Sequence, residues 1–223
     1  MATRRQRGER RADALSKERI VESAIEILDT DGESALTFRA LTARLATGAG
    51  AIYWHVANKD ELLTAATEAV IGRILTGVAG GPEPREAIRA LALGLFDAID
   101  AHPWVGTHLS RVPWQPAVLQ VFESIGGRLQ VLGVPDDALF DSASALLSYI
   151  LGVAGQNAAN ARMVEPGTDR SAFLAAVAGQ WMGSGPEKAP FAHRMAARMA
   201  DHDDREQFLA GIDLILAGIA TLG

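Results

Sequence analysis

The stretch from Thr37 to Lys59, TFRALTARLATGAGAIYWHVANK, constrains the fold more than any other part of the chain. Thr37 is suited to cap a first short helix, because its hydroxyl can accept a hydrogen bond from a free backbone N–H one turn in. Thr47-Gly48 interrupts the pattern, and a second short helix follows with Ile52, Tyr53, Trp54 and Val56. Two short helices joined by a tight turn are typical of a helix-turn-helix, whose second helix enters the DNA major groove. A plain helical corner has the same pattern, so the stretch alone leaves both interpretations open.

Helical periodicity continues on both sides, and no segment alternates with the period of two expected of a strand. Upstream, Ser16 is suited to cap a helix that Asp31-Gly32 ends. Downstream, Gly and Pro clusters separate helices expected at about 59–78, 84–101, 103–111, 116–132, 136–161, 171–182, 189–200 and 204–221. We therefore predict an all-α protein with a disordered Arg-rich arm at 1–15, a three-helix helix-turn-helix domain at 16–60 and a larger helical domain at 61–223.

Charge is distributed unevenly along this chain of net charge −6. Residues 1–60 hold ten Lys/Arg and nine Asp/Glu, whereas residues 61–223 hold eleven and eighteen. Five arginines, among them Arg4 and Arg5, lie within residues 1–11. A polyanion would therefore meet the N-terminal end and be repelled by the rest. The arginine cluster is equally compatible with a contact to DNA and with a solvated tail.

Several classes of protein are disfavoured by what the sequence lacks. The chain has no cysteine, which excludes disulfides and thiolate metal sites and fits a reducing cytoplasm. It has no run of 18 apolar residues and no signal-peptide segment, so we expect no membrane contact. Nucleophile-elbow and phosphate-loop motifs are missing, so we expect no enzyme. His202 lies among Asp201, Asp203 and Asp204, which indicates a solvated helix boundary, and we expect neither metal nor cofactor.

Two late segments carry apolar seams with small residues beside them. The last helix repeats apolar residues with the 4-3-4-3 spacing of a packed helix pair, and the 136–161 segment does the same. Each interior glycine costs about 1 kcal/mol against alanine, so several of them indicate close approach of another helix. Packing within the chain's own core would explain this, but we favour a homodimeric four-helix bundle. Its predicted interface residues are Leu146, Ile150, Gly152, Val153, Gly155, Ala159, Ile212, Ile215 and Ile219.

Several segments resemble the N-terminal domain of the TetR family of bacterial transcriptional regulators over residues 16–63. They are SKERIVESA at 16–24, Asp31-Gly32, TFRALTARL at 37–45 and AIYWHVANKDELL at 51–63. The resemblance implies a homodimeric repressor in the bacterial cytoplasm, associated with the nucleoid. Such a repressor releases a palindromic double-stranded DNA operator when a small molecule binds the C-terminal domain, here 61–223. It also implies a dimer interface built from two late helices, in agreement with the seams.

Matching the family's motif residue by residue assigns DNA contacts to Thr37, Arg39, Tyr53, Trp54, His55 and Lys59. Tyr53 and His55 match recognition-helix positions that contact bases or phosphates, with Trp54 beside them, whereas the other three match contacts to the DNA backbone. Hydroxyl, imidazole, ammonium and guanidinium donors at helix ends suit phosphate oxygens. A purely architectural helical protein would leave this polar face unexplained.

The chain departs from the family pattern in the turn, where Ala46 replaces the usual Gly and Thr47 replaces a hydrophobic residue. The recognition helix then starts Gly-Ala-Gly-Ala, with no side chain that can hydrogen-bond to a base edge. Ala49 and Ala51 can contact only thymine methyl groups. We therefore predict sparse direct readout, with specificity resting on Tyr53, Thr47, the Arg arm and DNA shape.

Aromatic residues with polar edges concentrate in the C-terminal half. Together they could line a cavity for a mostly apolar ligand, with His108, Gln156 or Asn157 fixing its orientation. Each of them singly is also explained as an ordinary core or surface residue. The predicted ligand-binding residues are Phe96, Trp104, His108, Trp114, Phe122, Tyr149, Gln156, Asn157 and Trp181.

Overall fold

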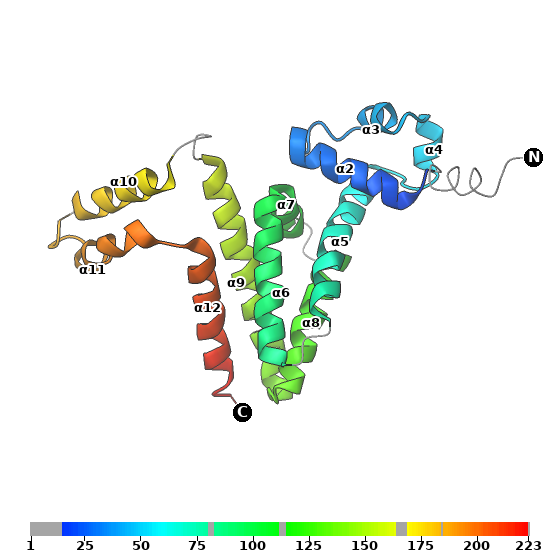
Figure 1. Cartoon of the computed structure of the whole chain (residues 1–223). Coiled ribbons are helices and arrows are strands. Elements are labelled where there is room, and N and C mark those ends of the chain that lie inside the picture. The colour runs from blue at the N-terminus through cyan, green and yellow to red at the C-terminus, as the bar shows by residue number, and fades with distance from the viewer. Residues whose placement is uncertain (1–14, 80–82, 112–114, 164–168, 184, 223) are drawn as a thin grey trace, which may run out of the picture.

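The computed structural model describes residues 15–79, 83–111, 115–163, 169–183 and 185–222, and over these residues all regular structure is helical, which confirms the predicted class (Figure 1). The elements are α2 (Lys17–Asp31), α3 (Phe38–Leu45), α4 (Ala49–Tyr53), α5 (Lys59–Val78), α6 (Pro84–Ala101), α7 (Pro103–Arg111), α8 (Pro116–Val131), α9 (Asp136–Met163), α10 (Arg170–Gly183), α11 (Pro190–Met195), the 3₁₀ helix η1 (Ala196–Asp201) and α12 (Asp204–Ile219). The helix expected at 189–200 is divided into α11 and η1.

Three short helices and the first turns of α5 form a small N-terminal unit. Ser16 caps α2, because its Oγ accepts a 3.3 Å hydrogen bond from the backbone N–H of Arg19. Ile20, Leu41 and Ile52 are fully buried. The apolar stripe of α2 therefore covers α3 and α4, as the sequence pattern predicts.

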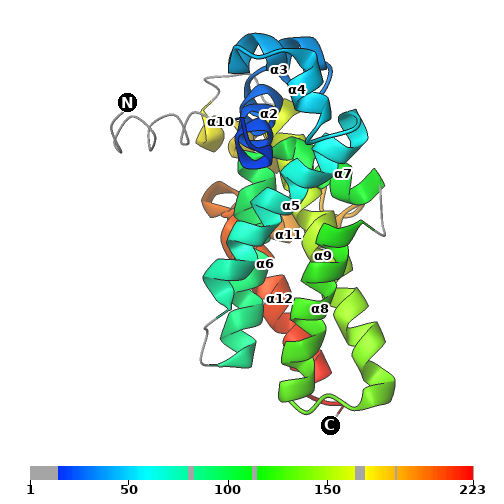
Figure 2. The ribbon, with the colours of Figure 1, turned by 90° about the vertical axis from the view of Figure 1, so that its right-hand side faces the viewer.

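Helix α5 joins this unit to the body of the protein. It begins after Asn58, whose side chain accepts a 2.8 Å hydrogen bond from the backbone N–H of Glu61. One end packs on α2 and the remainder on α6 and α8 (Figures 1 and 2). Arg128 of α8 donates a 2.9 Å hydrogen bond to the backbone carbonyl of Val78. Because one continuous helix belongs to both parts, the division into 16–60 and 61–223 stays a prediction.

Helix α6 runs through the centre of the body and packs against α5, α7, α8, α9 and α12. Its inward residues have no exposed surface: Ile88, Leu91, Leu95 and Ile99. Ion pairs fix α12 alongside it, with Arg205 bound through two 3.0 Å contacts to Asp97 and Arg89 bound to Asp213. These pairs hold α12 in position against the single-chain core.

Among the described helices, only α9 is long and apolar enough to cross a membrane by length and composition. The core helix of a soluble protein passes the same test, and α9 packs against α6, α7, α8 and α12. Only 28% of its most apolar 18-residue window is buried within the chain. A large part of α9 is therefore uncovered in a single copy.

Residues 170–201 form a side arm that leaves the body between the end of α9 and the start of α12 (Figure 1). Leu174 and Ala196 are buried among its helices. The contacts of α10, α11 and η1 are mainly with one another. The arm is thus a small unit that projects beyond the bundle.

Candidate DNA-binding surface and ligand cavity

The turn between α3 and α4 depends on a strained alanine. Ala46 has φ 50° and ψ 44°, in the left-handed region, and its N–H donates to the carbonyl of Thr42. Among the described non-glycine residues no other has a positive φ. This conformation costs an L-residue roughly 1–2 kcal/mol. Ala46, which stands where the family usually has Gly, is therefore strained. It is also the residue that sets the angle between α3 and α4.

The end of α4 presents two aromatic side chains to solvent. Tyr53 is 55% exposed and Trp54 is 89% exposed, whereas Ile52 and Val56 face the core. The Tyr53 ring stacks on Phe38 of α3 with centroids 4.5 Å apart and an interplanar angle of 9°. This stack restricts the ring and leaves the phenol free to meet a phosphate or a base.

The start of α4 carries only small groups. Gly48 caps the helix without a side-chain hydrogen bond. Ala49 is exposed, and Ala51 and Thr47 are partly exposed. Thr47 is the single residue in this group with a polar side chain. The geometry is therefore compatible with sparse base recognition, which stays a prediction.

The residues predicted to contact the DNA backbone differ in how free their side chains are to reach it. Arg39 on α3 is exposed and makes no ion pair with another described residue. Thr37 caps α3, with its Oγ1 accepting a 3.1 Å hydrogen bond from the N–H of Ala40, and its hydroxyl proton can still be donated. Lys59 Nζ instead donates a 2.6 Å hydrogen bond to the carbonyl of Glu33, so its ammonium already holds the loop before α3.

Two further predictions concern the edges of this surface. His55 is partly buried and lies near Glu18, whose pKa is lowered mainly by backbone and Ser16 hydrogen bonds. Arg4 and Arg5, with nearly all of the predicted 1–15 arm, lie outside the described residues.

Helix α7 is fastened to the N-terminal unit at both of its ends. At its start, Trp104 Nε1 donates a 2.7 Å hydrogen bond to Asp29 Oδ1, and His102 Nδ1 lies 2.8 Å from the same oxygen. At its end, Arg111 forms a 3.1 Å ion pair with Glu33. Displacement of α7 would therefore displace the end of α2 and the loop that leads to α3.

A cavity of about 420 Å³ lies between α7, α8 and α9. Its described lining residues are Leu109, Ser110, Val118, Leu119, Phe122, Phe140, Ser144, Leu147, Ser148 and Leu151. Phe122 and Phe140 meet edge to face at 5.8 Å and form an aromatic wall. The volume is within the range of about 300–1,000 Å³ typical of small-molecule sites.

Of the predicted ligand residues, Phe122 lines this cavity and several others have structural roles. Phe96 and Tyr149 both pack on Phe208, with centroids 4.7 and 5.6 Å apart, and the Tyr149 hydroxyl donates a 3.2 Å hydrogen bond to the Phe208 carbonyl. Burial raises the pKa of Tyr149. Trp104 donates its indole N–H to Asp29. These three predicted residues hold helices together and do not line the cavity.

The other polar and aromatic residues predicted to bind a ligand lie elsewhere. Gln156 is exposed, and Asn157 donates a 3.0 Å hydrogen bond to Asp100. Trp181 is on the side arm, away from the cavity of its own chain, and Trp114 lies outside the described residues.

His108 of α7 and Gln115, just before α8, are buried polar residues, and neither is among the residues that line the cavity. Gln115, which the sequence pattern did not indicate, donates a 3.1 Å hydrogen bond to the carbonyl of His108. Within the described residues, His108 Nε2 and Gln115 Oε1 are buried without a partner. Burial lowers the pKa of His108. Unpaired buried groups are costly, so this pair is suited to receive a ligand hydroxyl or a bound water.

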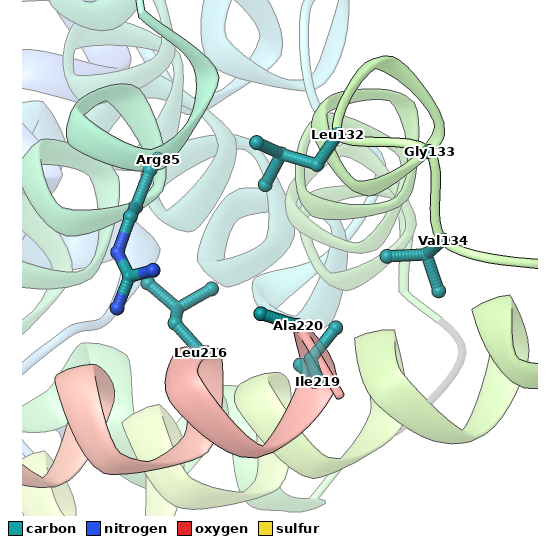
Figure 3. A pocket seen from close by; sticks show the side chains of 7 residues that line it. All are labelled: Arg85, Leu132, Gly133, Val134, Leu216, Ile219 and Ala220. Carbon is teal, nitrogen blue, oxygen red and sulfur yellow. The ribbon is translucent and has the colours of Figure 1, made fainter. Parts of the chain in front are cut away.

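A smaller hollow of about 100 Å³ lies at the opposite end of the body, between α6, α12 and the turn before α9 (Figure 3). Arg85 supplies its one charged side chain among apolar neighbours such as Leu216 and Ile219. It is well below the usual size of a ligand site.

The predicted dimer residues separate into two groups. Leu146, Ile150, Ile212 and Ile219 are at most 8% exposed in the single chain. Their side chains pack in the protomer's own core, and their part in a dimer interface stays a prediction. Gly152 and Ala159 are exposed, and Val153, Gly155 and Ile215 are partly so.

Glycines distinguish the inner from the outer face of α9 and α12. A Cβ on Gly211 would lie 1.8 Å from the Tyr149 hydroxyl, so Gly211 permits α12 to approach α9 within the chain. A Cβ on Gly152, Gly155 or Gly218 meets nothing within 4 Å. Together with Leu214, which is 74% exposed, these residues leave a face of small and apolar groups open to a second copy.

The sequence matches known families over nearly the whole described chain. Residues 20–66 match the bacterial regulatory proteins of the tetR family, and residues 81–222 match the tetracyclin repressor-like C-terminal domain. The chain belongs to the TetR family. Its fold and its helix-turn-helix are therefore those of DNA-binding transcriptional regulators, and the resemblance found at residues 16–63 is confirmed and extended.

Relatives in the TetR family agree in function and in fold. A helix-turn-helix-type transcriptional regulator of Saccharopolyspora erythraea is 32% identical over 160 residues, covering 71% of this chain and 67% of that protein. The solved transcriptional regulator SCO7222, a TetR from Streptomyces coelicolor, is 52% identical with a TM-score of 0.86, covering 94% of this chain and 99% of that one. ActR of Streptomyces coelicolor, solved in complex with actinorhodin, is 26% identical with a TM-score of 0.73, covering 94% and 99%.

Proposed function

We propose that two copies of this TetR-family chain bind a palindromic operator through α3 and α4, in the bacterial cytoplasm, and release it when a small molecule enters the cavity. The observation that carries the proposal is the double role of α7. Leu109 and Ser110 of α7 line the cavity, while Trp104 and Arg111 hold Asp29 and Glu33 of the N-terminal unit. A ligand that moves α7 therefore changes the position of the helix-turn-helix.

DNA contacts are proposed for the exposed side of this unit. Arg39 and Thr37 supply donors to phosphates, and Tyr53 with Trp54 meets the edge of the major groove. The small residues at the start of α4 let the backbone come close to the bases, so sequence preference depends on groove shape as well as on Tyr53. Lys59 contributes by holding the loop that carries Glu33.

The effector is proposed to be neutral and mostly apolar. No described residue that lines the cavity carries a charge, and the polar groups are the hydroxyls of Ser110, Ser144 and Ser148. Ser110 already donates a 2.8 Å hydrogen bond to the carbonyl of Gly106, so its oxygen is left to accept. A buried charge without a partner would be costly, which disfavours anionic or cationic ligands. The actinorhodin complex of ActR supports a small-molecule ligand for this chain.

The direct test is a fluorescence-anisotropy titration with duplex DNA taken from the region flanking the chain's own gene. We expect binding that weakens steeply as salt rises, because phosphate contacts release counterions. Tyr53→Ala should abolish it, whereas Val131→Ala, at an exposed position in the body, should leave it intact. Equal binding of all three proteins, or none above a random duplex, would contradict the proposal.

A further inference from the structure

Two serines of α9 lie on the wall of the ligand cavity with hydroxyl groups that the protein itself does not use. Ser144 and Ser148 line the cavity, and neither makes a hydrogen bond to another described residue. Other hydroxyls in the helices are satisfied locally, since those of Ser110 and Thr67 donate to the carbonyl four residues earlier. The two serines of α9 therefore keep a donor and an acceptor each for a bound molecule.

The rest of the described cavity wall offers no other free donor. Apart from its three serines, the described wall consists of leucine, valine and phenylalanine side chains. The proton of Ser110 is already donated to the carbonyl of Gly106. Among the described lining side chains, a ligand with acceptor oxygens can therefore meet a donor only at Ser144 and Ser148.

The spacing of these two hydroxyls is fixed by the helix that carries them. Ser144 and Ser148 are four residues apart within the continuous helix α9. Residues at this separation share one helix face, with Cβ atoms about 5–6 Å apart. Ser144 is partly buried and Ser148 is exposed, so the pair runs from the inside of the cavity toward its opening. A ligand that binds both serines must present two oxygens at a similar spacing along one edge.

Apolar groups surround the hydroxyl pair. Phe140 lies one helical turn before Ser144 and meets Phe122 of α8 edge to face at 5.8 Å. Leu147 and Leu151 continue the same cavity-facing side of α9. Aromatic side chains pack favourably against other rings. The cavity is therefore suited to a ring system whose polar edge faces α9.

We propose that Ser144 and Ser148 select effectors that carry two acceptor oxygens at opposite positions of one six-membered ring. Oxygens at opposite ring positions match the spacing of the two serines, whereas oxygens on adjacent ring atoms are too close together to reach both. Each serine donates one hydrogen bond, and the ring packs against Phe122 and Phe140. The inference rests on the proposed function of the cavity as an effector site, and it adds the chemical class of the effector and the two residues that recognise it.

Two isomers of one small compound separate this spacing from hydrophobicity in general. The probes are the para-quinone and the ortho-quinone of naphthalene, which have the same atoms but carry their carbonyls on opposite and on adjacent ring positions. Because the chain has no cysteine, it cannot form thiol adducts with them. Isothermal titration calorimetry measures both probes against the wild type, Ser144→Ala, Ser148→Ala and the double variant. The matched control is Ser171→Ala, at an exposed serine of α10.

We expect the wild type to bind the para-quinone about threefold to tenfold more tightly than the ortho-quinone, because one additional hydrogen bond forms. Each single variant should reduce this preference and the double variant should abolish it, whereas Ser171→Ala should keep it. Equal binding of the two isomers by the wild type, a preference that survives in the double variant, or no binding of either quinone would overturn the inference.

Titration of the same proteins with the DNA flanking the gene reports separately on the proposed function. Specific DNA binding by a wild type that does not distinguish the isomers would overturn the serine pair and leave the proposed function in place. A wild type that prefers the para-quinone but binds no DNA would overturn the proposed function and retain the recognition by the two serines.

Discussion

The indole of Trp104 donates a 2.7 Å hydrogen bond to the carboxylate of Asp29 and so fastens α7 of the ligand-binding body to α2 of the N-terminal unit. Trp104→Phe keeps an aromatic ring but removes the donor. We expect it to lower the free energy of unfolding by about 1.5–3 kcal/mol, since hydrogen bonds to charged groups contribute about twice as much as neutral ones. Urea denaturation measures this, and Trp181→Phe on the side arm is the matched control. An unchanged denaturation midpoint for Trp104→Phe would show that the contact does not hold the two parts together.

Ala46 in the left-handed region leads to a prediction of increased stability. Ala46→Gly removes the Cβ clash, and part of that gain is offset by the greater freedom of glycine in the unfolded chain. We expect a net gain of about 0.5–1 kcal/mol in the free energy of unfolding. The control is Ala90→Gly, at an exposed position inside α6, which should lose about 1 kcal/mol. If both variants lose stability, Ala46 is not strained.

The lowered pKa of His108 predicts that the stability of the protein depends on pH. Burial lowers its pKa below the usual 6.5, so the unfolded chain binds the proton more readily than the folded chain. Its contribution to the free energy of unfolding is fully present above about pH 6.5 and decreases as the pH falls from there toward the lower folded-state pKa. His108→Gln should flatten the slope of stability between about pH 7.5 and 5.5. Identical slopes for wild type and His108→Gln would exclude this residue as the cause.

Leu214 and Val131 provide a matched pair for the dimer face, because each is 74% exposed in the single chain. Leu214→Glu places a charge on the uncovered side of α12, where a partner would bury it. We expect it to raise the dimer dissociation constant by at least about tenfold, equivalent to 1.4 kcal/mol. Val131→Glu, at the end of α8, should leave the dimer unchanged. Sedimentation equilibrium compares them, and equal effects of the two changes would place the interface elsewhere.

The sequence is sufficient to predict a structural feature where the interactions that determine it are local. Thr37 and Asn58 cap helices through neighbours three residues away, and the run from Tyr53 to His55 identifies the recognition helix. Long-range contacts were not predictable in this way. Trp104 binds a carboxylate 75 positions earlier in the chain, and Lys59 binds a carbonyl 26 positions earlier.

Periodicity also cannot distinguish an apolar face that meets the chain's own core from one that meets a partner. The 4-3-4-3 seam through Ile150 and Ile212 is real but internal. The face open to a second copy instead carries Gly152 and Ala159, whose small side chains give little hydrophobic signal. Gln115 gave no signal at all, because its buried side chain is held by a hydrogen bond to the carbonyl of His108 in α7.

The central claim is that two copies of α4, placed by the α9–α12 face, enter successive major grooves of one operator. Hydroxyl-radical footprinting on the DNA flanking the gene tests it most directly. We expect two protected patches whose centres lie about one helical turn apart, near 34 Å, and both should disappear with Tyr53→Ala. A single protected patch, or two patches that persist in Tyr53→Ala, would contradict the account.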